Sequence, residues 1–209
     1  NIIKLVKPAK NSKILDIGSG TGHHVNMFTV NGYDTLGIDI SPAMIEKAKK
    51  NYPKLNKKFR EGDALNGMIY PERSFSVITS LFFTIYYIKN KQGFFENCMK
   101  WLVPNGYLAI HLVDRNKFDP IVPAGDPFVA VSTQAYADKR ITTSEVEFNT
   151  HNYKSKFEID PSNDTAVMNE TFKHRKNGNV IKNEHQLYME TQQAILAYAK
   201  NAGFISHAQ

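Results

Sequence analysis

The sequence predicts an α/β protein in which a doubly wound, mostly parallel sheet is followed by an antiparallel meander. Over residues 1–113, short apolar runs alternate with helical segments, as expected when buried parallel strands alternate with crossover helices. After residue 113, apolar and polar residues alternate with period two, which is typical of strands with one buried face. With 209 residues, 42% of them hydrophobic, the chain can bury a sizeable core.

The first half of the chain holds five expected strands, which end at turn-forming residues. They span residues 13–17, 34–39, 57–62, 75–80 and 107–113. Helices are expected over residues 23–30 and 90–102. A further helix should begin at Ser41-Pro42, because serine caps a helix N-terminus and proline suits its first turn. The turn 104–106 (Pro-Asn-Gly) should lead into the fifth strand.

The second half of the chain has a different sequence pattern. Residues 114–140 contain Pro120, Pro123 and Pro127, so we expect an irregular connection with at most a short helix. Three alternating segments follow, over residues 153–159, 166–172 and 181–189. Asn177-Gly178 predicts a type I′ hairpin between the last two. A helix is then expected over residues 191–201, followed by the start of a further strand at Phe204-Ile205.

This pattern divides the chain into three parts. Residues 1–113 form the core, residues 114–190 are an inserted cover, and residues 191–209 are a return helix and the start of a core strand. The meander has one apolar face and no helix of its own, so it should bury that face against the core or against a partner chain. An oligomer formed through the meander is therefore one possibility.

The charge distribution argues against nucleic acid as a partner. The formal net charge is +6, but residues 111–190 hold 10 Lys and Arg against 12 Asp and Glu. The surplus is concentrated over residues 47–60, on a helix face and the loop after it, and few aromatic residues accompany it. No apolar run approaches the ~18 residues of a membrane span. We expect neither nucleic acid nor membrane as a partner.

The single cysteine, Cys98, cannot form an internal disulfide. It lies in a helical pattern, where a small buried hydrophobe is the commoner role than a nucleophile. The first residues show no signal-peptide pattern, so a reducing cytoplasm is expected. The chain begins without methionine, and we expect it to be a piece of a longer protein.

The most informative segment is the glycine-rich turn that follows the first strand. Gly18, Gly20 and Gly22 allow the backbone to turn sharply and to bring its amides close to a ligand at a helix N-terminus. Dinucleotide-binding enzymes use a similar turn. Here, however, the spacing is G-x-G-x-G, and His23 stands where the dinucleotide fingerprint has its third glycine.

Two carboxylates accompany this turn. Asp16 lies two residues before the first glycine, where it could brace the loop amides or bind an ammonium group. Asp39 ends the second strand. A carboxylate accepts hydrogen bonds at both oxygens, so Asp39 suits the two vicinal hydroxyls of a ribose.

With these motifs, residues 13–113, and more loosely the rest of the chain, resemble the class I (Rossmann-like) S-adenosylmethionine-dependent methyltransferases. Residues 16–22 resemble the first motif of that family, with Ser19 in place of the frequent cysteine. Asp39 matches the ribose-binding acid, and residues 61–64 (Glu-Gly-Asp-Ala) match the third motif. Residues 75–80 match the fourth strand, and residues 104–108 resemble the turn into the fifth.

The resemblance implies a seven-stranded type of sheet whose terminal strand pair is truncated here, and S-adenosylmethionine as the cofactor. The inserted segment resembles that of small-molecule N-methyltransferases, including those acting on amino sugars and glycine, and it would cover the substrate side. The implied cofactor-binding residues are Asp16, Gly18, Ser19, Gly20, Gly22, His24, Asp39, Ile40, Met44, Asp63, Ala64, Ser80 and Leu81.

Methyl transfer needs an acceptor atom positioned ~3 Å from the methyl group, exclusion of water and, for some acceptors, removal of a proton. Phe82, Tyr86 and Asp114 are candidate substrate-binding residues, although core packing is an equal alternative for the aromatic ones. His111 and Tyr87 are candidate catalytic residues, and a core histidine is the alternative for His111. The remaining histidines show no metal-ligand spacing, so no metal is expected. Of these, His174 and His185 could meet across the hairpin.

The sequence thus predicts an S-adenosylmethionine-dependent methyltransferase that acts on a small polar acceptor by N- or O-methylation. One alternative is an NAD(P)-dependent oxidoreductase, which would use the same glycine turn and ribose acid. The other is a protein of the same fold that binds the cofactor without catalysis. The identity of the acceptor is not determined by the sequence.

Overall fold

The computed structural model describes residues 2–10, 12–116 and 142–207. The chain forms two compact units. The first comprises Asn1–Leu112 and Ile195–Gln209, and the second comprises Val113–Ala194. The return helix, α6 (Gln192–Asn201), therefore begins in the second unit and continues in the first, instead of starting a third part. The expected irregular connection lies largely over residues 117–141, outside the described residues.

The first unit contains a parallel sheet with the strand order β3-β2-β1-β4-β5. Its strands are β1 (Lys13–Ile17), β2 (Asp34–Asp39), β3 (Phe59–Glu61), β4 (Phe75–Ser80) and β5 (Leu102–Ile110). Every neighbouring pair is parallel. The doubly wound parallel sheet is thus confirmed, and β1 lies at its centre.

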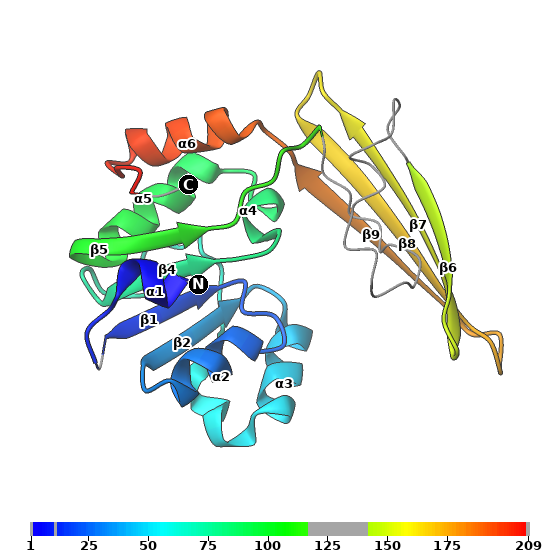
Figure 1. Cartoon of the computed structure of the whole chain (residues 1–209), viewed down its shortest axis with the longest axis horizontal. Coiled ribbons are helices and arrows are strands. Elements are labelled where there is room, and N and C mark those ends of the chain that lie inside the picture. The colour runs from blue at the N-terminus through cyan, green and yellow to red at the C-terminus, as the bar shows by residue number, and fades with distance from the viewer. Residues whose placement is uncertain (1, 11, 117–141, 208–209) are drawn as a thin grey trace. The chain divides into compact units, whose positions relative to one another are not determined.

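Helices cover both faces of this sheet, with α2 and α3 on one side and α5 and α6 on the other (Figure 1). The helices are α1 (Ile2–Val6), α2 (His23–Val30), α3 (Pro42–Asn51), α4 (Thr84–Tyr87), α5 (Lys91–Trp101) and α6, with the 3-10 helix η1 (Pro53–Lys58). As expected, Ser41 caps α3, and its side chain accepts a hydrogen bond from the Met44 N–H (3.4 Å). Cys98 is buried in α5, and burial raises the pKa of its thiol, so it serves as a core residue.

Three expectations for the first unit need correction. The third strand is shorter than expected, because η1 occupies residues 53–58. The fifth strand begins at Leu102 and includes the residues expected to form a turn; Asn105 takes a positive φ of 61° there, and a register shift beside Phe75 accommodates the extra residues. Phe204 begins no strand: its ring packs edge-on against Phe95 of α5, with the centroids 6.1 Å apart.

The second unit contains an antiparallel sheet with the order β6-β7-β8-β9. Its strands are β6 (Thr143–Glu147), β7 (His151–Asp160), β8 (Thr165–His174) and β9 (Val180–Tyr188). The expected meander is β7–β9, and Gly178 turns the last hairpin with φ 71°. The sequence did not reveal β6, because Val146 is its one buried residue and the alternation is too weak to recognise. His174 pairs with His151 and His185 with Met168, so the two histidines do not meet.

The described residues contain no helix long and apolar enough to cross a membrane. They also contain no group of three or more His, Cys, Asp and Glu side chains arranged to hold a metal ion.

Candidate functional site

The candidate site lies where β1, β2 and β4 end at the same edge of the parallel sheet. In open α/β sheets, ligands bind at the carboxyl ends of the strands, where the strand order reverses. Here the order reverses at β1, whose neighbours are β2 and β4. The loop of residues 18–22 leaves β1 at this edge and leads into α2.

The three glycines of this loop have different roles. Each takes a positive φ, of 69° at Gly18, 51° at Gly20 and 88° at Gly22. A Cβ atom would lie 2.4 Å from Thr84 Oγ1 at Gly18 and 2.7 Å from Phe59 Cζ at Gly22, so both positions are needed for close packing. At Gly20 a Cβ would have no neighbour within 4 Å. The middle of the loop is therefore open to a ligand.

Asp39, at the end of β2, holds this loop. The Gly20 N–H donates to Asp39 Oδ2, and the Ser41 N–H donates to Asp39 Oδ1, both at 2.9 Å. The expectation that Asp16 could brace the loop amides is thus corrected, because Asp39 accepts from the loop amide. Each carboxylate oxygen has a second lone pair, so both can still accept hydrogen bonds from a ligand.

Asp16, near the end of β1, is buried beside the loop. Its Oδ1 accepts a hydrogen bond from Thr79 Oγ1 (2.6 Å), whereas its Oδ2 has no hydrogen-bond partner and lies 3.8 Å from His24 Nδ1. Burial raises the pKa of Asp16 to about 7, with a smaller upward contribution from the Asp39 charge and an opposing one from the Thr79 hydrogen bond. A buried carboxylate oxygen without a partner is costly, and a cationic ligand group would relieve this cost.

His24, in the first turn of α2, contacts aromatic residues. Its pKa is lowered by burial and, less strongly, by the neighbouring His23. The neutral form is therefore favoured, and its ring centroid lies 5.5 Å from that of Phe82. Gly22 occupies the N-cap position of α2, and no side chain caps this end. The first N–H groups of the helix are thus available to a ligand.

Phe82 follows β4 and lies between two histidine rings. Its φ is 53°, unusual for a side chain of this size, and the residue is 62% exposed. It approaches His24 on one side, while the exposed His111, after β5, lies 6.4 Å from both Phe82 and Phe83. The structure therefore brings Phe82, His24 and His111 together. His111 is not the core histidine that the sequence left as an alternative.

The other acceptor-side candidates lie in different environments. Tyr86 is fully buried in the core of the first unit, whereas Tyr87 is half exposed. Asp114 belongs to the second unit, where its Oδ1 accepts a hydrogen bond from the Asn116 N–H (3.0 Å). Leu81 is half-buried and directly follows β4.

An apolar surface adjoins Asp39 on the side of β3. Ile40 and Met44 are both exposed next to it, and the Gly62 N–H donates to the Asp39 carbonyl (3.0 Å). Asp63 is exposed, with its Oδ1 accepting from the Leu65 N–H, and Ala64 is buried behind it. Exposed apolar side chains beside a carboxylate suit a planar base attached to a ribose.

The sequence indicated Ser19 and Ser80 as cofactor-binding residues but did not indicate Thr79, which hydrogen-bonds to Asp16. Thr79 is a fully buried strand residue that pairs with Asp16 in the register of β1 and β4. Its role could be recognised only once β4 was placed next to β1. The buried hydroxyls of Ser19 and Ser80 also have no hydrogen-bond partner. Unpartnered buried oxygens at this edge fit a site that receives hydrogen-bond donors from a ligand.

The comparisons with known proteins agree with this geometry. Residues 15–110 match the model of a family described as methyltransferase domain. The chain is similar to the phosphoethanolamine N-methyltransferase of Plasmodium falciparum, with 33% identity over 111 residues, 52% of this chain and 42% of that protein. It is also similar to the demethylmenaquinone methyltransferase of Chlorobaculum parvum, with 34% identity over 116 residues, 54% of this chain and 46% of that protein.

The fold is also that of a solved S-adenosylmethionine-dependent methyltransferase from Clostridium acetobutylicum. The TM-score is 0.73 at 15% identity, covering 96% of this chain and 75% of the other. The chain spans less than half the length of the two curated relatives. Their names refer to acceptors of different chemistry, an amine and a quinone, so the similarity of the first half does not determine the acceptor.

Proposed function

Because residues 15–110 match the methyltransferase-domain family and the fold is that of a solved S-adenosylmethionine-dependent methyltransferase, we propose that the chain transfers a methyl group from S-adenosylmethionine to a small polar acceptor, at nitrogen or oxygen. The observation that carries this proposal is the open glycine loop with a carboxylate on each side. Asp39 holds the loop and keeps free lone pairs, and Asp16 keeps one buried oxygen without a hydrogen-bond partner.

Each chemical group of the cofactor has a candidate binding residue at this edge of the sheet. Asp39 would accept hydrogen bonds from the ribose hydroxyls, and Ile40 and Met44 would pack against the adenine. Asp16 would accept from the ammonium group at the other end, near His24. The ring of Phe82 would offer an electron-rich face to a cation. When bound, S-adenosylmethionine supplies a methyl group activated by a sulfonium charge.

On the acceptor side, His111 is the proposed proton acceptor. Its imidazole is exposed and lies against the rings of Phe82 and Phe83, and histidine is the side chain most often used as a general base. Tyr87, which is half exposed in the first unit, is the proposed polar contact, whereas Tyr86 is fully buried in the core.

Two observations support a small polar acceptor. The second half of the chain carries no surplus of positive charge, which nucleic acid binding would need. The P. falciparum relative is named for a small amine, phosphoethanolamine. We also propose that the reaction takes place in a reducing cytoplasm, since Cys98 is a single buried thiol, and that copies of the chain associate through the sheet of the second unit.

The proposal is tested by incubating the full chain with S-adenosylmethionine and a panel of small amines, amino sugars, hydroxyl compounds and carboxylates. Mass spectrometry should find a gain of one methyl group on an amine or a hydroxyl compound. The His111→Gln variant should keep its affinity for the cofactor while losing most of its turnover. Thermal shift with NADH in place of S-adenosylmethionine provides the control. Stabilisation by NADH alone would contradict the proposal and favour an oxidoreductase.

A further inference from the structure

A cluster of polar side chains lies on the sheet of the second unit. We propose that Glu170, Tyr153 and Phe172 form a binding site for the ammonium group of a small organic cation, with His185 at its edge. The site lies entirely within the second unit, on one face of the antiparallel sheet.

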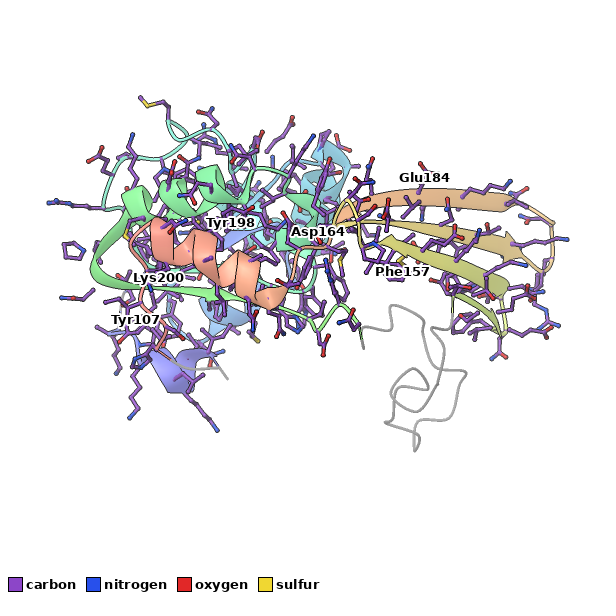
Figure 2. All side chains as sticks on the ribbon, turned by 90° about the horizontal axis from the view of Figure 1, so that it is seen from above. Tyr107, Phe157, Asp164, Glu184, Tyr198 and Lys200 are labelled. Atoms are coloured by element: carbon purple, nitrogen blue, oxygen red, sulfur yellow. The ribbon has the colours of Figure 1, made fainter. Side chains whose placement is uncertain are left out.

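The register of the strands brings these side chains to the same face. Tyr153 of β7 pairs with Phe172 of β8, and Glu170 of β8 pairs with Ser155 on one side and Asn183 on the other. Residues paired in adjacent strands point to the same face of a sheet. By the same register, Phe157 lies on the face of the cluster and Glu184 on the opposite face; Figure 2 labels both residues on this sheet.

Glu170 is the centre of a hydrogen-bonded group. The Tyr153 hydroxyl donates to Glu170 Oε1 (2.7 Å), and His185 Nε2 lies 3.1 Å from Glu170 Oε2. Burial, with a smaller contribution from Glu170, raises the pKa of Tyr153 to about 12. The phenol therefore stays protonated and neutral, and it serves as a hydrogen-bond donor to Glu170.

One carboxylate lies on this face. Among the described strand residues, Glu170 is the one carboxylate on the face, no Lys or Arg accompanies it, and its one potential cationic partner there is the imidazole of His185, which carries a charge only when protonated. The opposite face carries paired charges instead: Lys154 with Glu145 (2.5 Å) and Lys156 with Glu158 (2.8 Å). A partly buried carboxylate is stabilised when a cation compensates its charge.

Aromatic rings beside Glu170 complete the site for a cation. The ring centroids of Tyr153 and Phe172 lie 4.9 Å apart, and their electron-rich faces attract ammonium groups. The site is accessible at Glu170 and His185, whose side chains are 17% and 31% exposed, whereas Tyr153 is buried. A carboxylate next to aromatic faces selects an organic ammonium ion over a neutral molecule of the same size.

The ligand class is a small organic cation that carries an ammonium group. Its binding to the second unit does not depend on the proposed function.

The test uses the full-length chain and NMR of the assigned His185 ring, titrated with methylammonium chloride. Methanol is the neutral probe of equal size, and KCl at equal ionic strength controls for salt. We expect a saturable shift of the His185 signal with methylammonium alone. Glu170→Gln should weaken this binding about tenfold or more, because a charge-assisted hydrogen bond is lost.

Glu158→Gln is the matched control, since it removes an equal charge from the opposite face of the same sheet and should leave methylammonium binding unchanged. Equal responses to methylammonium and methanol in the wild-type chain would overturn the proposal, even if Glu170→Gln failed to fold. So would unaltered binding in folded Glu170→Gln. Calorimetry with S-adenosylmethionine tests the proposed function separately, because that binding depends on residues of the first unit.

Discussion

The two units of this protein place their polar side chains in different parts of the secondary structure. In the first unit, the carboxylates of Asp16 and Asp39 lie at or near the ends of neighbouring strands, on either side of a loop that is open at Gly20. In the second unit, Glu170 lies in the middle of a strand, and its contacts are residues of the adjacent strands. Local motifs therefore indicate the first site, whereas the second depends on strand register.

The largest expected difference concerns independent stability. Residues 113–194 expressed alone should show no cooperative thermal transition, because one face of their sheet holds apolar residues such as Phe157 and Leu187 without a helical layer among the described residues to cover them. Circular dichroism of the fragment and of the full chain provides the comparison. A sharp melt of the fragment would show that the second unit is an autonomous domain.

A second prediction separates the binding sites of the two units. Asp39→Ala should weaken S-adenosylmethionine binding by roughly 1.5–3 kcal/mol, because charge-assisted hydrogen bonds to the ligand are lost together with the support of the Gly20 amide. Calorimetry measures the change. Asp34→Ala, at the other end of β2, and Glu170→Gln should both leave it unaffected. Unchanged affinity in Asp39→Ala would remove Asp39 from the site.

The third prediction concerns pH. The pKa of Asp16 is raised to about 7, so its ionisation opposes folding, and this penalty grows as the pH rises from about 4 to about 7. A cationic ligand favours the ionised form. Affinity for S-adenosylmethionine should therefore increase with pH through about 7, with release of protons that calorimetry in buffers of different ionisation enthalpy detects. Asp16→Asn should abolish this dependence; if it persists, another group is responsible.

The smallest expected effect is the loss of stability when either of two glycines is replaced by alanine. Both glycines have a positive φ and open space around them. Gly20→Ala and Gly178→Ala should each cost about 1–2 kcal/mol of stability, the strain of a left-handed conformation. Chemical denaturation measures this cost. Only Gly20→Ala should also weaken cofactor binding, because its Cβ would enter the open space of the loop. Equal binding by the two variants would place the cofactor elsewhere.

Much of the fold followed from the sequence because its signals are local. Apolar runs, the glycine turn and the Ser41-Pro42 helix start each involve few consecutive residues, and all agree with the structure. The errors occurred where local signals are weak. The strand β6 has a single buried residue, Val146, and the residues expected to form a turn before the fifth strand are held in β5 by its pairing with β4.

By itself, the sequence determined the parallel core, the glycine loop and the acid at the end of β2, because each of these features is specified by a few neighbouring residues. Only the tertiary structure decided which groups meet: Thr79 with Asp16, 63 residues apart, the Gly20 amide with Asp39, and His185 with Glu170. These contacts depend on strand order and register, which are set by burial of whole faces and not by the residues that finally touch.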